Sequence, residues 1–423
     1  MAPYSGQSKA KAATPPTQTR WLTLAAGLVA GYILGMVIME TADVMYTSKV
    51  EHAMHAATPA EGPLQAAPAP AKPQPVSRQL DIKPAGDTIH SLLTSNGSPY
   101  QGFQTRIMYG TYKLVQAMPG GEKLTGFTRV MHRTTDDFLM DEVPTFRAQP
   151  LHPKCDEYCD FPVADRANAV VQWIQAVKKD PSMLQGAWVL LLESDYVWMK
   201  PVRAPDAASS APGFQYHYDY IQAEHPNAAP HIKKLFGSSA PAPVPNSGPA
   251  PALLRFSELE VVAPEWERVT ALIEMDKAAV DALGWVREMY AWDVALALHP
   301  DVKMLTQEPY ESVLLVQPPH EDHLGNASMC HYTWGAIYND SSSTVWRWEK
   351  RDYTALKDAL KVPHLAMPPE PFKPNTWHLQ AHEPVTEQLH ATLTAMIAQM
   401  NRAIDLLPDL TNKVKTARRM RLL

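Results

Sequence analysis

Apolar strand-like and helix-like segments alternate along the middle of this chain, and this alternation restricts the fold more than any other feature of the sequence. Residues 88–95, 124–132 and 187–194 have the short apolar composition of buried strands, whereas residues 102–117 and 164–177 carry apolar side chains at helical spacing. Strands that alternate with helices favour an α/β fold whose central sheet is mostly parallel.

The rest of the globular part is less regular. Asp165 is a plausible cap for the second helix. A segment rich in Pro, Ala and Ser at 237–252 interrupts the domain, a helical pattern resumes at 282–299, and residues 363–374 are rich in proline. A final amphipathic helix is expected over 384–407, with Pro384 in its first turn, where proline is tolerated.

The N-terminal part predicts a membrane anchor. Residues 21–39 contain no charged side chain and would span about 28 Å as a helix, close to the thickness of a bilayer core. Lys9, Lys11 and Arg20 precede this stretch with no acid among them, which favours a cytosolic N-terminus. A cleaved signal peptide is the alternative, but the apolar run is long and no clear small-x-small cleavage site follows it.

Composition then divides the chain into five parts. We expect a cytosolic tail at 1–20, a transmembrane signal anchor at 21–39, a Pro/Ala-rich stalk at 40–86, a lumenal domain at 87–410 and a basic tail at 411–423. This is the plan of a Golgi type II membrane enzyme, although a tethered adhesion or matrix module would share it. The net charge of −6 and the absence of a basic face make nucleic acid an unsuitable partner.

The three cysteines exclude a disulfide framework and a four-ligand zinc site. Cys155 and Cys159 would lie in a lumenal loop, where they could pair. Sequons at three positions are candidate N-glycan sites: Asn326, Asn339 and, more weakly because proline follows, Asn96.

Two carboxylates follow the third predicted strand. The run "WVLLL" ends in Glu193 and Asp195, and alternation along an extended chain would point both side chains the same way. The carboxyl ends of parallel strands are where open α/β sheets bind ligands. Two converging acids repel each other unless a cation lies between them, so a divalent ion with a diphosphate beyond it is one interpretation. A solvated turn with two incidental acids is the other.

A series of longer motifs favours the first interpretation. They occur in the order "GFTRVMH", "LMDEVPTF", "VVQWIQ", "ESDYVWMKP", "WVREMYAW", "HYTWG" and "WRWEKRDY". From Ser91 to about Tyr353 the chain closely resembles the plant and algal hydroxyproline O-arabinosyltransferases. The resemblance implies a Golgi type II membrane enzyme with a GT-A-like domain, which binds a nucleotide sugar.

The resemblance also implies a reaction. Members of that family transfer L-arabinofuranose from UDP-β-L-arabinofuranose to the hydroxyl of 4-hydroxyproline, with retention of the anomeric configuration. The implied partners are hydroxyproline-containing secreted peptides or extensin-like glycoproteins. Another peptidyl O-glycosyltransferase, such as one that adds galactose to serine, is the rival within enzymes.

The family motifs map onto particular residues. The family's Glu-Pro-Asp motif is Glu193-Ser194-Asp195 here, with both acids kept. A loop that usually reads Gly-Asn-Ser-Pro is 248–251 with the sequence "GPAP", so two polar side chains are missing and any substrate contact from this loop is in doubt. The His-Tyr-Thr-x-Gly motif is intact from His331.

Chemistry assigns roles around the acid pair. We expect Asp195, Glu193 and His331 to bind a metal, because a set of carboxylates and an imidazole suits Mn²⁺, or another divalent cation, better than Ca²⁺. The donor-binding set is predicted to be Glu193, Asp195, Lys200 and Thr94, with Lys350 or Arg351 as further cations for the diphosphate. His331 could instead be an ordinary, partly buried histidine.

A second group is expected on the sugar or acceptor side. If residues 282–299 form one helix, Trp285, Glu288 and Trp292 share a face, and aromatic rings beside an acid suit a sugar or prolyl ring. Asp195 and Glu288 are the predicted catalytic residues, and Asp141 and Glu142 could bind the acceptor or hold a loop. Core packing of both tryptophans, with Glu288 paired to an arginine, is the alternative.

Two classes of function therefore stay open. One is a metal-dependent glycosyltransferase, supported by Glu193, Asp195, Glu288 and His331 together. The other is a stalked binding or wall protein that kept the fold and lost activity, favoured only by the altered loop at 248–251.

Overall fold

The computed structural model describes residues 86–206, 208–239 and 242–412. The predicted tail, anchor and stalk lie before residue 86, and most of the predicted C-terminal tail lies after residue 412, so these assignments stay predictions. Within the described ranges, no helix combines the length and the apolar character that a membrane crossing requires.

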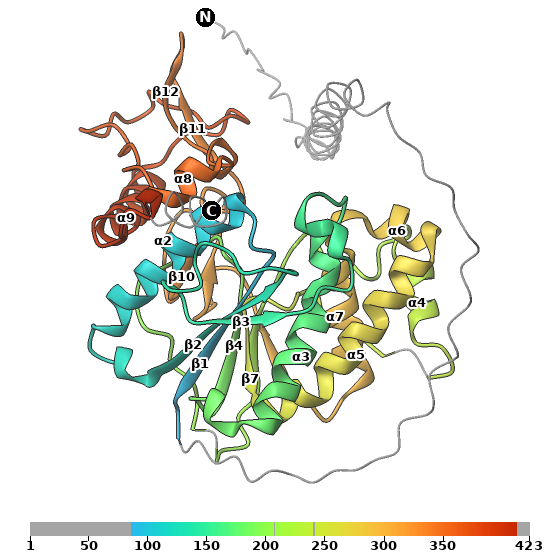
Figure 1. Ribbon diagram of the computed structural model, residues 1–423. Coiled ribbons are helices and arrows are strands. Elements are labelled where there is room, and N and C mark those ends of the chain that lie inside the picture. Colours follow the sequence, from blue (N-terminus) through green and yellow to red (C-terminus); the bar gives the residue numbers. More distant parts are fainter. Residues whose placement is uncertain (1–85, 207, 240–241, 413–423) are drawn as a thin grey trace, which may run out of the picture. The chain divides into compact units, whose positions relative to one another are not determined.

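A seven-stranded sheet forms the centre of the described part (Figure 1). In spatial order its strands are β3 (Thr145–Ala148), β2 (Leu124–His132), β1 (Ile89–Ser95), β4 (Trp188–Leu192), β7 (Ala252–Arg255), β6 (Gly213–Tyr216) and β8 (Met304–Gln307). Every strand except β7 runs in the same direction, because β7 alone pairs antiparallel with its neighbours β4 and β6. The expected α/β fold with a mostly parallel sheet is confirmed.

Two smaller sheets accompany the large one. The first has the order β5 (Tyr196–Trp198), β10 (Met329–His331) and β9 (Leu315–Val316), and the second joins β11 (Ala336–Asn339) to β12 (Thr344–Trp348). Strand β5 begins just after the acid pair, so the chain passes directly from the large sheet into the three-stranded one.

Helices cover both faces of the large sheet (Figure 1). On one side α3, α5 and α7 pack against one another, with α4 and α6 beside them, and on the other side α2 packs against α8 and α9. Their bounds are α2 (Pro99–Gln116), α3 (Arg166–Lys179), α4 (Ala229–Leu235), α5 (Phe256–Met275), α6 (Lys277–Leu283), α7 (Arg287–Leu298), α8 (Leu356–Leu360) and α9 (Glu387–Ile404).

Strand β4 is the most buried part of the sheet. All five of its residues are buried, because β1 and β7 flank it and helices cover both faces. A strand of this kind has to be apolar throughout, which explains the run "WVLLL". In register, Leu93 of β1 lies opposite Leu192 of β4, so Thr94 and Glu193 follow side by side at the same edge.

Three expectations about helices need correction. The segment 282–299 is not one helix, since α6 ends at Leu283 and a 3₁₀ turn, Gly284–Val286, separates it from α7; Gly284 has a φ of 59°, which a residue without a Cβ adopts at little cost. Helix α9 begins only at Glu387, because Thr386 caps it by accepting a hydrogen bond from the Leu389 N–H, and Pro384 therefore precedes the helix.

Asp165 is the third case. It stands at the N-cap position of α3, but its side chain makes no capping bond. Its carboxylate instead accepts a hydrogen bond from the backbone N–H of His152 and contacts the imidazole of the same residue. Asp165 therefore fixes the loop before the helix and does not accept hydrogen bonds from the first backbone N–H groups of α3.

The Pro/Ala-rich segment 237–252 does not separate two parts of the domain. Residues 247–251 are buried, and the backbone N–H of Ser247 donates to Oδ2 of Asp293 in α7. A Cβ on Gly248 would lie 2.6 Å from the terminal methyl carbon of Met289, so a larger residue here would require the Met289 side chain of α7 to move. The loop is a packed part of the domain that leads into β7.

Candidate active site

The acid pair lies where the sequence predicted it, at the carboxyl end of β4. The side chain of Glu193 is 34% exposed and that of Asp195 is 10% exposed. Between them, the buried Ser194 donates a hydrogen bond from its hydroxyl to Gln104 of α2. The short loop between two sheets thus holds both acids, one more accessible than the other.

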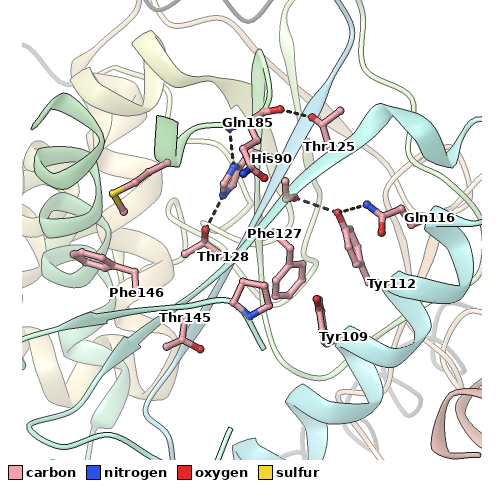
Figure 2. Close-up of a pocket in the computed structure, with 13 residues that line it drawn as sticks. His90, Tyr109, Tyr112, Gln116, Thr125, Phe127, Thr128, Thr145, Phe146 and Gln185 are labelled. Atoms are coloured by element: carbon pink, nitrogen blue, oxygen red, sulfur yellow. Dashed lines mark hydrogen bonds between the residues drawn. The ribbon is translucent and has the colours of Figure 1, made fainter. Parts of the chain in front are cut away.

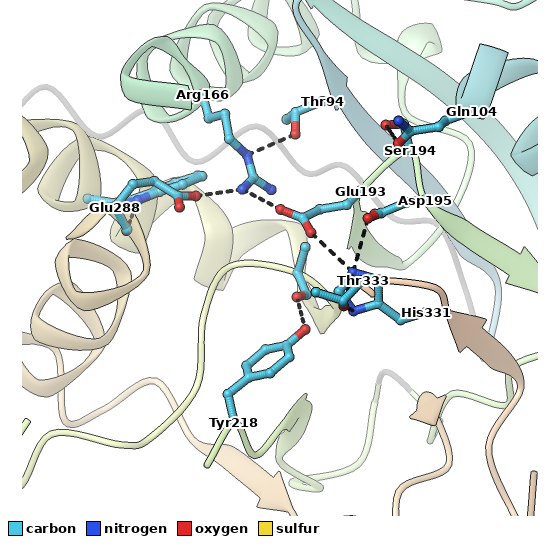
Figure 3. Close-up of polar contacts among 12 residues, drawn as sticks. Thr94, Gln104, Arg166, Glu193, Ser194, Asp195, Tyr218, Glu288, His331 and Thr333 are labelled. Atoms are coloured by element: carbon cyan, nitrogen blue, oxygen red, sulfur yellow. Dashed lines mark hydrogen bonds and ion pairs between the residues drawn. The ribbon is translucent and has the colours of Figure 1, made fainter. Parts of the chain in front are cut away.

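His331 joins the pair from 136 positions further along the chain. It ends β10, and the antiparallel pairing of β10 with β5 sets it opposite Tyr196, the residue after Asp195. Its Nε2 atom lies 3.2 Å from Oδ2 of Asp195 and 3.9 Å from Oε2 of Glu193 (Figure 3). One ligand atom from each of the three residues falls within 4.8 Å of the others, and in the described part of the chain no other group of His, Cys, Asp or Glu does so.

Lys350 is a second partner of Asp195. Its Nζ atom lies 2.5 Å from Oδ2, and the side chain is buried. Burial raises the pKa of Asp195, but the Lys350 ammonium and the His331 imidazole outweigh it and hold the pKa well below its usual range. Of the two cations considered for the diphosphate, Lys350 reaches the acids, whereas Arg351 pairs with Glu349.

Arg166 occupies the corresponding place beside Glu193. This buried first residue of α3 directs Nη1 at Oε1 of Glu193 and at Oε1 of Glu288, both at 2.7 Å, and its Nε donates to the hydroxyl of Thr94 (Figure 3). Arg166 was not among the residues predicted from the sequence. The available signal was a lone arginine at the start of a helix whose core face is otherwise apolar, and a buried arginine requires partners.

Glu288 lies behind Arg166 and is only 3% exposed. Burial raises the pKa of Glu288 to about 7, although the Arg166 guanidinium beside it favours the charged form. The carboxylate therefore contacts the acid pair only through Arg166. Pairing with an arginine, the alternative considered for Glu288 from the sequence, is what the structure shows.

The two tryptophans predicted beside Glu288 do not share its environment. Trp285 is in the 3₁₀ turn before α7, is 63% exposed and makes an edge-to-face contact with Phe161. Trp292 is fully buried and packs against Trp266 with ring centroids 5.3 Å apart. The prediction that both rings lie on one helical face with Glu288 is wrong, because the helix begins only at Arg287.

Three other candidates lie elsewhere. Lys200 donates to the carbonyl of Gly325, and no ion pair joins it to the acids within the described ranges. Glu142 pairs at 2.9 Å with the fully buried Arg106, which also binds two carbonyl oxygens at the end of α8, so this acid holds α2 against α8. Asp141, next to it, is exposed.

Cys155 and Cys159 are joined in a disulfide, as considered from the sequence. Cys330 is a buried free thiol, and burial raises its pKa to about 12, so it stays protonated and inert beside His331.

Two cavities have linings that do not include the acid cluster. One, of about 410 Å³, is next to His90 and Gly126 near the amino ends of β1 and β2, where the short strand β3 leaves the edge of β2 open (Figure 2). Because the strands are parallel, this is the end of the sheet opposite to the acids. The other, of about 500 Å³, is lined by polar residues of 217–225 and by Asn246.

The geometry defines an α/β protein with a carboxylate–imidazole cluster at the carboxyl edge of a mostly parallel sheet. A family model described as the hydroxyproline O-arabinosyltransferase family N-terminal domain matches residues 89–305. Hydroxyproline O-arabinosyltransferase 1 of Arabidopsis thaliana is 32% identical over 294 residues, which are 66% of this chain and 74% of that protein. Hydroxyproline O-arabinosyltransferase PLENTY of Lotus japonicus is 34% identical over 62% of this chain and 71% of its own.

Solved structures give only a distant likeness. A glycosyltransferase involved in the glycosylation of the major capsid of PBCV-1 aligns over 58% of this chain and 93% of its own, with 13% identity and a TM-score of 0.33. The galactosyltransferase LgtC aligns over 58% and 87%, with 9% identity and a TM-score of 0.32. These scores are too low to support an assignment.

The family match and the relatives together establish that the chain belongs to the hydroxyproline O-arabinosyltransferase family. It is therefore a glycosyltransferase by family, which favours the enzyme over the binding protein considered from the sequence. The family match includes Arg166, Glu193, Asp195 and Glu288 and ends before His331.

Proposed function

We propose that the protein transfers L-arabinofuranose from UDP-β-L-arabinofuranose to the hydroxyl of peptidyl 4-hydroxyproline, with retention of configuration, in a metal-assisted GT-A-like site. The observation that supports this most is the convergence of Glu193, Asp195 and His331 within 4.8 Å at the carboxyl edge of the sheet. Curated relatives bear the name of this activity. The acceptors we propose are hydroxyproline-containing secreted peptides or extensin-like glycoproteins.

The three side chains of Glu193, Asp195 and His331 fit a divalent cation as ligands. Two carboxylates in the loop after β4 and one imidazole at the end of β10 would hold it, and this mixture of ligands suits Mn²⁺. Bound there, such an ion would neutralise charge on the donor diphosphate as the bond to the sugar breaks.

Two buried cations complete the electrostatics of the site. Lys350 lies against Asp195 and Arg166 against Glu193, so each acid already has a positive partner. In our proposal Lys350 binds the diphosphate oxygens and Arg166 fixes the orientation of Glu193. Thr94 keeps Arg166 in place through its hydroxyl.

The surroundings of Glu288 bear on the route of transfer. A covalent intermediate requires a carboxylate that can approach the anomeric carbon, whereas Glu288 is 3% exposed and bonded to Arg166. This supports a front-face route. The acceptor oxygen forms its bond to the anomeric carbon as the bond to the diphosphate breaks, and the leaving diphosphate takes the hydroxyl proton. Glu288 then acts as a positioning residue through Arg166.

A panel assay tests the proposed reaction. Purified protein is incubated with a hydroxyproline peptide and with UDP-arabinofuranose, UDP-arabinopyranose, UDP-galactose or UDP-glucose, and a serine peptide serves as the matched acceptor control. We expect a pentose to be added to the hydroxyproline peptide from UDP-arabinofuranose only. Preferential transfer of galactose to the serine peptide would overturn the proposal in favour of the rival activity.

We also propose a Golgi membrane location, with residues 21–39 as a single-pass anchor and the catalytic domain in the lumen. The support is the uncharged stretch and its basic flank, which lie outside the described residues. A C-terminal tag should resist protease in sealed vesicles and become sensitive once detergent is added. Cleavage of the tag in intact vesicles would contradict this topology.

A further inference from the structure

A row of aromatic rings begins beside the acid cluster. The ring of Tyr218 lies 5.2 Å from that of Tyr220, which makes an edge-to-face contact with Trp334 at 6.3 Å. His320 also contacts Trp334 edge to face, with ring centroids 4.4 Å apart and ring planes at 83°. We call Tyr220, Trp334 and His320 the aromatic wall; no residue of it was predicted from the sequence.

The aromatic wall is joined to the acid site through Trp334 and, through Tyr218 next to Tyr220, to the loop at 248–251. Trp334 is three residues from His331, which limits the distance between their Cα atoms to about 11 Å. The hydroxyl of Thr333, between them, lies 2.9 Å from Nδ1 of His331. At the other end, the buried hydroxyl of Tyr218 donates to the carbonyl of Ala250, in the loop that packs against α7.

Exposure distinguishes the wall from the core rings around it. Tyr218 is 1% exposed and forms part of the interior, as do Tyr196 and Tyr332. Tyr220 and Trp334 are half-buried, and His320 is exposed. These three residues can therefore contact a bound molecule without any rearrangement of the core.

Rings of this kind suit a particular ligand. The saturated faces of prolyl and hydroxyprolyl rings pack on aromatic faces, and proline-rich segments in the extended polyproline II conformation bind to aromatic-lined grooves.

We propose that Trp334 and Tyr220 form the acceptor subsite, and that they hold the prolyl or hydroxyprolyl ring of an extended, proline-rich peptide in front of the acid cluster. The proposal rests on the proposed function, since it assigns the peptide acceptor of that reaction. It replaces Trp292 as an acceptor residue and gives the His-Tyr-Thr-x-Gly stretch two roles, in which His331 faces the donor and Trp334 the acceptor.

The test compares binding and kinetics in Trp334→Leu, Tyr220→Leu and Trp334→Phe. A fluorescently labelled hydroxyproline peptide is titrated in the presence of UDP, and UDP affinity and hydrolysis of the donor sugar are measured on the same preparations. Tyr109→Leu, in the cavity at the opposite end of the sheet, is the matched aromatic control. Melting temperatures identify any variant that is merely misfolded.

We expect Trp334→Leu and Tyr220→Leu to weaken peptide binding roughly tenfold or more, as for an aromatic anchor in an interface. UDP affinity and donor hydrolysis should stay within about twofold of wild type, and Trp334→Phe should recover part of the loss. Tyr109→Leu should bind the peptide normally.

Unchanged peptide binding in a folded Trp334→Leu protein would overturn the acceptor subsite, as would equal losses for peptide and UDP. The proposed function fails differently. If the wild-type protein binds the peptide through Trp334 but adds no arabinose from UDP-arabinofuranose, the subsite stands and the assigned reaction falls.

Discussion

The Nζ atom of Lys350 lies 2.5 Å from Oδ2 of Asp195, although 155 positions separate the two residues along the chain. Both are buried, and the same carboxylate oxygen also faces His331. The repulsion expected between Glu193 and Asp195 is therefore relieved by the chain's own cations, with Lys350 on one acid and Arg166 on the other. A divalent ion at this site would have to share Asp195 with a resident ammonium group.

Replacing Lys350 by Met should destabilise the fold in the presence of a chelator, because it leaves a buried carboxylate without its cation. Loss of one partner of a buried ion pair costs about 3–5 kcal/mol. Urea unfolding in EDTA measures this loss. Mn²⁺ should then raise the melting temperature of Lys350→Met more than that of wild type, since the ion no longer competes with the ammonium. Equal unfolding curves with equal responses to Mn²⁺ would mean that the pair contributes nothing to either property.

Glu288→Gln should lower turnover by about 10- to 100-fold while leaving UDP affinity nearly unchanged, because Arg166 loses a charged partner and holds Glu193 less firmly. Steady-state kinetics and UDP titration on one preparation measure the two effects. Arg166→Lys, which keeps the charge but cannot bind both acids from one planar group, should act in the same direction. Full turnover in Glu288→Gln would remove its positioning role.

The same variant makes a prediction about pH. The pKa of Glu288 is raised from an ordinary 4.5 to about 7 in the folded protein, so its contribution to stability is fully present below pH 4.5 and is lost as the pH rises through 7. Gln does not titrate, and Glu288→Gln should therefore gain stability relative to wild type between pH 5 and pH 8, by up to about 3 kcal/mol. A constant difference across that range would contradict the assignment.

Acid should destabilise the domain through two buried histidines. Burial lowers the pKa of His90 to about 4 and that of His132 to about 4, compared with about 6.5 in an unfolded chain. The unfolded state takes up protons first as the pH falls, so stability is present above 6.5 and is lost between 6.5 and 4. His90→Gln should flatten that loss by up to about 3 kcal/mol in urea unfolding series, whereas a variant of the exposed His382 should not.

Three neighbouring strands of the sheet, β2, β1 and β4, could be predicted from the sequence because each is a short apolar run. Strand β2 has the predicted bounds, and β1 and β4 agree within one or two residues at each end. Strands β3, β6, β7 and β8 were not predicted. The four residues of β7, Ala252–Arg255, follow a Pro/Ala-rich segment that has the composition of a linker. The end of that segment is buried by contacts with residues distant in the sequence, among them the hydrogen bonds that join Ser247 to Asp293 and Tyr218 to Ala250.

The candidate site was predictable to the extent that its residues follow from local chemistry. Glu193, Asp195 and His331 converge as expected. The end of an apolar strand indicated the two acids, and the His-Tyr-Thr-x-Gly motif shared with the family indicated His331. Arg166 could not be recognised, since its partners lie 27 and 122 positions away and only the packing of α3 against the sheet brings them together. The prediction for Trp285 and Trp292 failed for a local reason, because the 3₁₀ turn that begins at Gly284 interrupts the helix on which both were placed.

Two roles were considered for Glu142 from the sequence, acceptor binding and holding a loop. Its ion pair with the fully buried Arg106 supports the second role. Glu142→Gln should lower the free energy of unfolding by about 1–3 kcal/mol, because a charged hydrogen bond becomes a neutral one. The Michaelis constant for the peptide should not change. A raised Michaelis constant in a fully stable variant would return Glu142 to the acceptor side.

If Glu193, Asp195 and His331 form the metal-assisted centre of a glycosyltransferase, catalysis should require both the ion and Asp195. The decisive measurement is the rate of arabinose transfer to a hydroxyproline peptide by wild type and by Asp195→Asn, each with EDTA and with Mn²⁺. Wild type should be active with Mn²⁺ and lose most activity in EDTA. With Mn²⁺, Asp195→Asn should be at least about 100-fold slower than wild type, because it lacks the ligand at which the ion, His331 and Lys350 meet. Urea unfolding should also show a less stable but folded variant, since Lys350 loses its buried partner. Full wild-type activity in EDTA, or Asp195→Asn turnover close to that of wild type, would contradict the account.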